Sequence, residues 1–103
     1  MIKEINNEKE FNELLKKEKI VVIDFSADWC PTCKLFKPIF TKVAKSNDDA
    51  IYAIVDVDSN SNLATEWGVQ SIPTTVFIKD NKEVERISGF INEDDLISKV
   101  KGL

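Results

Sequence analysis

Two apolar runs constrain the fold of this chain more than any other feature. The first is Ile20-Val21-Val22-Ile23-Asp24-Phe25, and the second is the nearly continuous apolar stretch over residues 51–57. Because successive side chains of a strand point to opposite faces, a run that is apolar at almost every position predicts a strand buried on both faces. Such strands occur in sheets that carry helices on both sides. The two runs therefore predict central strands of an α/β protein.

Helical patterns precede and separate these strands. Asn7 and Glu10 resemble a capping box, with Asn in place of Ser or Thr, and predict a helix of about ten residues behind them. Residues 31–46 form a second helical pattern, interrupted by Pro38. A proline removes one backbone hydrogen bond inside a helix, so we expect a kink there.

The second half of the chain completes the pattern. Residues 63–67 predict a short helix, and residues 74–79 and 83–88 predict a hairpin across residues 80–82. Val84 and Ile87 are three positions apart, which breaks strict alternation and indicates a bulge in the last strand. Asn92 is expected to cap a final helix whose buried side holds Leu96, Ile97 and Val100.

Together with a weak first strand at Ile2 and Ile5, the order is β-α-β-α-β-α-β-β-α. Strands separated by helices are expected to pair in parallel through right-handed crossovers, and the hairpin adds an antiparallel edge. We therefore expect residues 1–103 to form one α/β domain, a mixed sheet with helices on both faces.

Composition excludes several classes of function. The chain has no histidine, which removes Ser-His-Asp and Cys-His catalysis and any zinc site that needs imidazole. Its net charge is −4 and its one arginine is Arg86, a balance that argues against a nucleic-acid partner. No stretch is long and apolar enough to span a membrane, and the N-terminus lacks the apolar run of a signal peptide. We expect a cytoplasmic, monomeric protein without metal or cofactor.

Both cysteines lie at the junction of a central strand and a helix, in Trp29-Cys30-Pro31-Thr32-Cys33. Open α/β sheets place their sites at the carboxyl ends of strands, and a helix N-terminus favours a thiolate over a thiol. A second cysteine one turn later can attack the mixed disulfide formed by the first. Half a zinc knuckle and an unreactive core pair are alternatives, but the chain has no further Cys or His ligand, and Pro, Thr and Lys are poor core neighbours. The pair therefore indicates redox chemistry.

The chain resembles the thioredoxin family over essentially its whole length. The landmarks are Asp24-Phe25-Ser26-Ala27, Trp29-Cys30-x-x-Cys33-Lys34, Pro38, Val55-Asp56-Val57-Asp58, Gly68-Val69-Gln70-Ser71-Ile72-Pro73-Thr74 and Gly89. The resemblance implies the thioredoxin fold and a protein disulfide reductase whose nucleophile is Cys30 and whose resolving thiol is Cys33. It also implies a cis bond before Pro73, which would leave the Ile72 backbone free to pair with an extended substrate strand beside the cysteines. Disulfide-containing proteins would be substrates, and a separate reductase would restore the dithiol.

Further site residues follow from the residues around the cysteines. Asp24 is either a strand-end carboxylate in solvent or, as we expect, a buried acid with a raised pKa that exchanges the Cys33 proton. Trp29 is either a core aromatic or a wall of the site, which we favour. Pro31, Thr32, Ile72, Pro73 and Gly89 complete the expected substrate-binding wall. Cys30 is expected to be the exposed thiol, with Thr32 donors pointing toward its sulfur.

Two departures from the family pattern leave alternatives open. The usual intervening Gly-Pro pair is replaced by Pro31-Thr32, and Ile54 stands where many members carry a charged residue near the buried acid. A more oxidising disulfide oxidase or isomerase is therefore one alternative, and its potential would separate it from a reductase. A thioredoxin-like binding subunit with incidental redox activity is the other.

Overall fold

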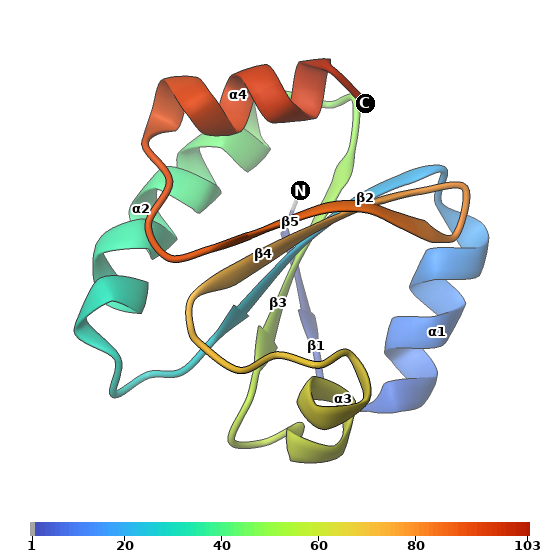
Figure 1. Ribbon diagram of the computed structural model, residues 1–103. Coiled ribbons are helices and arrows are strands. Elements are labelled where there is room, and N and C mark those ends of the chain that lie inside the picture. The colour runs from blue at the N-terminus through green and yellow to red at the C-terminus, as the bar shows by residue number, and fades with distance from the viewer. Residues whose placement is uncertain (1) are drawn as a thin grey trace.

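The computed structural model describes residues 2–103 and contains one five-stranded sheet with four helices (Figure 1). The strands are ordered β1-β3-β2-β4-β5. Their bounds are Ile2–Ile5 (β1), Ile20–Ser26 (β2), Ile51–Asp56 (β3), Thr74–Lys79 (β4) and Lys82–Ser88 (β5). The helices span Glu8–Lys17 (α1), Pro31–Ser46 (α2), Ser61–Glu66 (α3) and Glu93–Lys101 (α4). The predicted mixed sheet and element order are confirmed, and α2 continues through Pro38.

Strand direction departs from the expectation at one place. β1, β3 and β2 pair in parallel, but β4 is antiparallel to β2 although a helix separates it from β3. The cause is the length of α3: six residues rise about 9 Å, whereas β3 covers about 20 Å. The helix is too short to carry the chain back along the sheet. β4 therefore starts where β2 ends, with Thr74 opposite Phe25.

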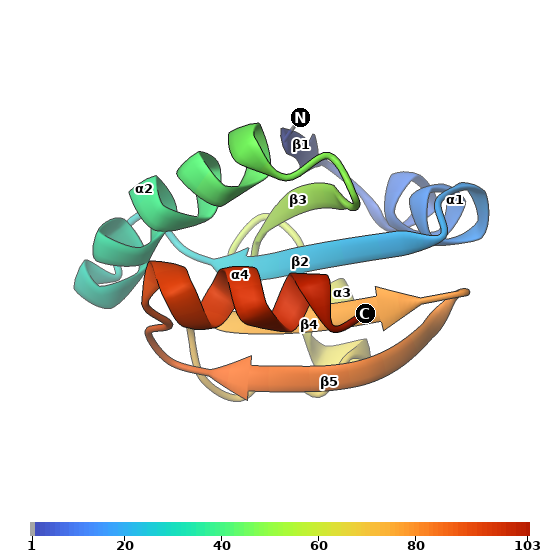
Figure 2. The same ribbon diagram turned by 90° about the horizontal axis from the view of Figure 1, so that it is seen from above.

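Helices cover both faces of the sheet, with α1 and α3 on one side and α2 and α4 on the other (Figures 1 and 2). On the α1 side, residues such as Phe11 and Phe25 form one buried cluster, and Trp67 packs edge-on against Phe11 with ring centroids 5.2 Å apart. On the α2 side, Phe40 packs edge-on against Tyr52 at 5.6 Å within a second cluster. Since β2 lies in the middle of the sheet, both of its faces are buried, which explains its continuous apolar run.

Side-chain caps define the helix ends. Asn7 Oδ1 accepts a hydrogen bond from the Glu10 backbone N–H at 2.9 Å, while Glu10 Oε1 accepts from Asn6 instead of completing the reciprocal bond to Asn7. Asn92 Oδ1 caps α4 by accepting from the Asp95 N–H at 2.9 Å. Both predicted caps are therefore present, the first as a variant of the capping box.

The hairpin between β4 and β5 turns at Asp80 and Asn81, whose φ angles of 52° and 65° fit a tight two-residue hairpin turn. β5 starts at Lys82, one residue earlier than expected. The predicted bulge is confirmed: Phe77 pairs with Glu85 and Ile78 with Glu83, so Val84 is the extra residue.

Candidate active site

Cys30 lies immediately before α2, at the position that caps the helix. Its backbone is extended (φ −84°, ψ 115°), and its Sγ accepts a hydrogen bond from the Cys33 N–H at 3.2 Å. The first N–H groups of a helix have no partner inside the helix, and a polar side chain at the cap supplies one. Here a sulfur takes that role. The N-terminus of α2, whose partial positive charge stabilises an anion, therefore faces the Cys30 sulfur.

Both thiols are buried, so the expectation of an exposed Cys30 is wrong. Cys30 is 5% exposed and Cys33 is 2% exposed, and the two are free cysteines. The two thiols are buried because Ala27 and the partly buried Val57 and Ile72 of the same chain pack around them. Burial, followed by the hydrogen bond with the Cys30 side chain, raises the pKa of Cys33 to about 11.

The segment before β4 passes directly over Cys30. Cys30 Sγ lies 3.8 Å from the Ile72 carbonyl oxygen, and the Ile72–Pro73 peptide bond is cis. The Pro73 carbonyl accepts a hydrogen bond from the Gly89 N–H at 2.7 Å, which places Gly89 at the same end of the sheet. The backbone at Ile72, which lies 42 positions after Cys30 in the sequence, thus forms one side of the cysteine site.

Asp24 is fully buried in β2, on the face that α2 covers, so the solvent-facing alternative is wrong. Neither carboxylate oxygen has a hydrogen-bond partner among residues 2–103, and the same holds for the hydroxyl of Thr75, its neighbour on β4. Burial raises the pKa of Asp24 from 3.8 to about 7, and the positive charge of Lys37 opposes that rise. Ile54 is its partner on β3, so the position where many family members carry a charge directly adjoins the acid.

A pocket of about 600 Å³ opens beside this acid. Its lining includes Cys33 and Lys37 from α2, Ser26 from β2, and Ile54 and Asp56 from β3. The pocket thus joins the second thiol to the residues that surround Asp24. A pocket of this size admits water beside Cys33, whereas Asp24 lies behind the lining residues and is itself fully buried.

Trp29 is 64% exposed, so the core alternative is wrong for this residue. Its indole Nε1 donates a hydrogen bond to Asp58 Oδ2 at 2.7 Å. Asp58 is itself held in a turn, because its backbone N–H donates to Asp56 Oδ1 at 2.8 Å. The landmark Asp56-Val57-Asp58 therefore positions the tryptophan next to the cysteines, a function that the sequence reasoning did not assign.

Pro31 and Thr32 are exposed at the start of α2. Among residues 2–103, the hydrogen bond to Cys30 Sγ comes from the Cys33 N–H, so the expected Thr32 donors do not reach the sulfur. The reason is capping geometry, in which the acceptor bonds the N–H two or three positions into the helix. The sequence analysis assigned no role to Thr75, which pairs with Asp24 across β2 and β4, or to Lys37, whose charge lowers the Asp24 pKa. The signal for Thr75 was its place after the Pro73-Thr74 landmark.

Taken together, two thiols at a helix N-terminus, a buried acid and the cis Ile72–Pro73 segment, in which Ile72 is partly buried and Pro73 buried, define a site for thiol–disulfide exchange. Among the described residues, no group of three or more His, Cys, Asp or Glu is arranged to hold a metal ion. No helix in residues 2–103 is long and apolar enough to cross a membrane.

Known proteins identify the family. The sequence model of the thioredoxin family matches residues 2–102, so the chain belongs to that family. A thioredoxin of Mycoplasmoides gallisepticum is 40% identical over 95 residues, covering 92% of this chain and 95% of the relative. A mutant thioredoxin from Halobacterium salinarum superimposes with a TM-score of 0.93 at 32% identity, covering 98% of this chain and 88% of that one.

A similar structure, with a TM-score of 0.91, comes from work on yeast. That work concerns the thiol resolving mechanism in mitochondrial 1-Cys peroxiredoxin via glutathione/thioredoxin systems. The structure is 34% identical and covers 99% of this chain and 95% of that one. The fold is accordingly the thioredoxin fold, and the chain is a thioredoxin-type dithiol–disulfide oxidoreductase that reduces protein disulfides through its Cys-x-x-Cys pair.

Proposed function

We propose that Cys30 is the nucleophile of this disulfide reductase. Its thiolate attacks one sulfur of a substrate disulfide, forms a mixed disulfide and releases the other substrate sulfur as a thiolate. The observation that carries the assignment is the capping contact, in which the Cys33 N–H donates to Cys30 Sγ at 3.2 Å. A hydrogen bond and a helix dipole directed at one sulfur stabilise negative charge on that atom and not on the other.

Cys33 resolves the mixed disulfide in the second step. It loses its proton and attacks Cys30 Sγ, which releases the reduced substrate and leaves the oxidised Cys30–Cys33 pair, a two-electron exchange. Asp24 takes the Cys33 proton through an intervening water molecule. An acid whose pKa is raised to about 7 is suited to this task, because it exchanges protons near neutral pH.

The Ile72 backbone receives the substrate strand next to Cys30. Trp29, Pro31, Thr32, Pro73 and Gly89 form the surrounding wall, and exposure of Trp29, Pro31 and Thr32 supports a contact surface there. An extended peptide that pairs with a free backbone edge gains affinity without a fixed sequence, which suits a general reductase.

The partners follow from the reaction. Disulfide-containing proteins are the substrates, and a separate thioredoxin-reductase-type donor returns two electrons to the pair. The yeast peroxiredoxin system associated with a similar structure is one substrate class of this kind. We further propose that residues 1–103 act as a single monomeric domain in the cytoplasm.

Trapping tests the division of roles. The Cys33→Ser variant lacks the resolving thiol, so it should accumulate mixed disulfides on Cys30 that mass spectrometry can identify. Cys30→Ser is the matched control and should trap nothing. Mixed disulfides on Cys33 of the Cys30→Ser variant, at the level seen on Cys30, would reverse the assignment.

Two further measurements address Asp24 and the more oxidising alternative. Asp24→Asn should slow resolution of a preformed mixed disulfide more than the first attack, because only resolution needs the Cys33 proton removed. An equal effect on both steps would remove Asp24 from the mechanism. Equilibration with glutathione should give a potential near about −270 mV, whereas a value of about −180 to −120 mV would identify an oxidase or isomerase.

A further inference from the structure

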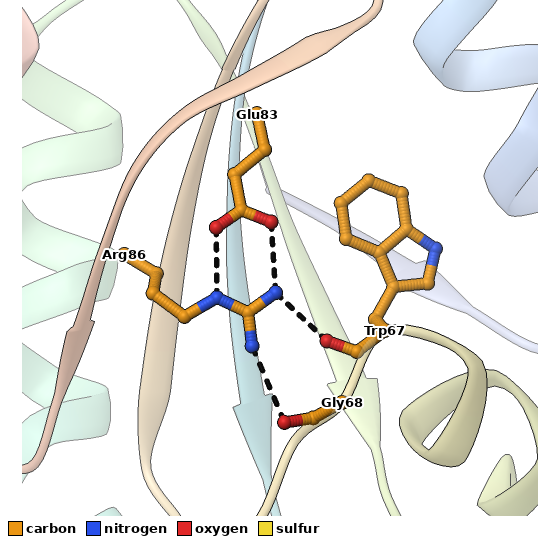
Figure 3. A network of polar contacts seen from close by, with 4 residues as sticks. All are labelled: Trp67, Gly68, Glu83 and Arg86. Atoms are coloured by element: carbon orange, nitrogen blue, oxygen red, sulfur yellow. Dashed lines mark hydrogen bonds and ion pairs between the residues drawn. The ribbon is translucent and has the colours of Figure 1, made fainter.

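The only arginine of the chain, Arg86 on β5, connects two distant segments (Figure 3). Its Nε and Nη2 donate to the two carboxylate oxygens of Glu83, each at 2.8 Å. Its Nη2 also donates to the Trp67 carbonyl at 2.7 Å, and its Nη1 to the Gly68 carbonyl at 3.4 Å. One planar guanidinium thus holds a carboxylate on one edge and two backbone carbonyls on the other.

The β-bulge makes this arrangement possible. Residues three apart in a regular strand point to opposite faces, so Glu83 and Arg86 would not meet. With Val84 as the extra residue, Arg86 lies opposite Val76 and Glu83 lies opposite Ile78. Val76 and Ile78 both belong to the cluster on the α1 side, so the bulge places the acid and the base on the same face. Both side chains are about one third exposed, so the pair is partly shielded from water.

The two carbonyls that Arg86 holds stand at the start of the segment that reaches the cysteines. We call residues 68–73 the docking segment, since it runs from the end of α3 to the Ile72–Pro73 bond beside Cys30. It contains no helix or strand, and Gly68, Gln70 and Ser71 are exposed. At its far end it is tied to the sheet through the Pro73 carbonyl and the Gly89 N–H.

At its near end, the hydrogen bonds of the segment within residues 2–103 go to the short helix α3 and to Arg86. Gly68 N–H donates to the Thr65 carbonyl and Val69 N–H to the Ala64 carbonyl, so these bonds fix the segment to α3. Trp67 and Val69 pack against the apolar cluster on the α1 side, and Arg86 adds the hydrogen bonds from the sheet to this corner. The last carbonyls of a helix also carry partial negative charge, which a cation neutralises.

We infer that Arg86, anchored by Glu83, is a positioning residue for substrate: it fixes the docking segment so that Ile72 presents its backbone to the substrate strand. The inference rests on the proposed role of Ile72. Binding to a segment that is already ordered avoids the free-energy cost of ordering it. Loss of the hydrogen bonds from Arg86, which we call the Arg86 clamp, should therefore weaken substrate binding and leave the thiol chemistry intact.

The test compares a protein disulfide with a small one. Arg86→Gln should raise KM for reduction of insulin about threefold to tenfold, with kcat unchanged. Its rate with 5,5′-dithiobis(2-nitrobenzoate), which has no peptide strand to pair, should equal that of the wild type. Arg86→Lys keeps the charge but not the planar fork, and it should recover only part of the loss. Amide hydrogen exchange at Val69 and Gln70 should accelerate in Arg86→Gln.

Glu85→Gln is the matched control. Glu85 pairs with Lys99 at 2.8 Å on the opposite face of the same strand, so its loss removes an ion pair without touching the docking segment. An unchanged KM in Arg86→Gln, an equal loss toward both disulfides, or the same KM rise in Glu85→Gln would overturn the inference. If Arg86→Gln does not fold, Glu83→Gln removes the anchor alone and should still raise KM, and no rise there would count equally against it. A wild-type protein that reduces neither disulfide would instead refute the proposed function.

Discussion

Asp24→Asn should make the protein more stable, and the gain should depend on pH. The carboxyl group is fully buried and has no hydrogen-bond partner among residues 2–103, so the folded protein disfavours its charged form. Asparagine has nearly the same shape and never ionises. The substitution therefore removes the cost of a buried charge and leaves the packing of β2 largely unchanged.

The magnitude follows from the two pKa values. The unfolded chain releases the proton near the ordinary value of 3.8, whereas the folded protein keeps it until about pH 7. Between these values the folded state binds more protons, so the wild-type stability falls as pH rises, and the penalty is complete above pH 7. At about 1.4 kcal/mol per pKa unit, a rise of about three units costs about 4 kcal/mol. Below pH 3.8 both proteins are neutral at this position and the penalty is absent.

Urea unfolding of the reduced proteins, measured from pH 4 to pH 8, tests this reasoning. The difference in unfolding free energy between Asp24→Asn and the wild type should grow steadily with pH and level off at about 4 kcal/mol more than at pH 4. Other carboxylates titrate equally in both proteins and cancel in the difference. A difference that does not change with pH would show that Asp24 ionises with its ordinary pKa in the folded protein, and the buried-acid argument would then be refuted.

The remaining predictions concern Lys37, whose charge acts on Asp24, and Gly68, the first residue of the docking segment. Lys37→Gln should raise the Asp24 pKa further, because the charge of Lys37 lowers that pKa, and added salt should make the difference between the two proteins smaller. ¹³C NMR titration of the Asp24 carboxyl group measures the pKa in both proteins. An unchanged or lower pKa in Lys37→Gln would contradict the prediction. Gly68→Ala should cost about 1–2 kcal/mol in urea unfolding, since Gly68 has φ +65° while open space surrounds a Cβ there. Gly102→Ala is its control: with φ −79° at the end of α4, it should lose clearly less, and equal losses would refute a backbone cause.

Much of the fold could be predicted because its signals are local. The apolar runs of β2 and β3, the caps at Asn7 and Asn92 and the irregular spacing in β5 each depend on residues that are close together in the sequence. The direction of β4 could not be read in this way. It depends on the length of α3 compared with β3, a relation between two elements that no pattern within either one expresses.

The site divides in the same way. The cysteine spacing and the buried position of Asp24 are properties of two short segments, so the sequence indicated both. Burial of Cys30 and the tie between Trp29 and Asp58 depend on contacts across 29 to 42 positions of sequence, and the first was predicted wrongly and the second was missed. The clamp of Arg86 required the bulge, the register of β5 and the end of α3 together. Composition singled out this arginine but gave it no role.

The effect of Cys30 on the pKa of Cys33 supports the proposed order of the reaction. In the reduced protein, the pKa of Cys33 is about 11, well above that of Asp24 at about 7, so Cys33 holds its proton. Burial is the main cause of that high value, but hydrogen bonding to Cys30 and the charge of Cys30 add to it. Once Cys30 Sγ is bonded to a substrate sulfur, it carries no charge, and its contribution to holding the Cys33 proton is lost. Attack by the first thiol therefore makes the second easier to deprotonate, which is the order that the proposed role of Asp24 as the base requires.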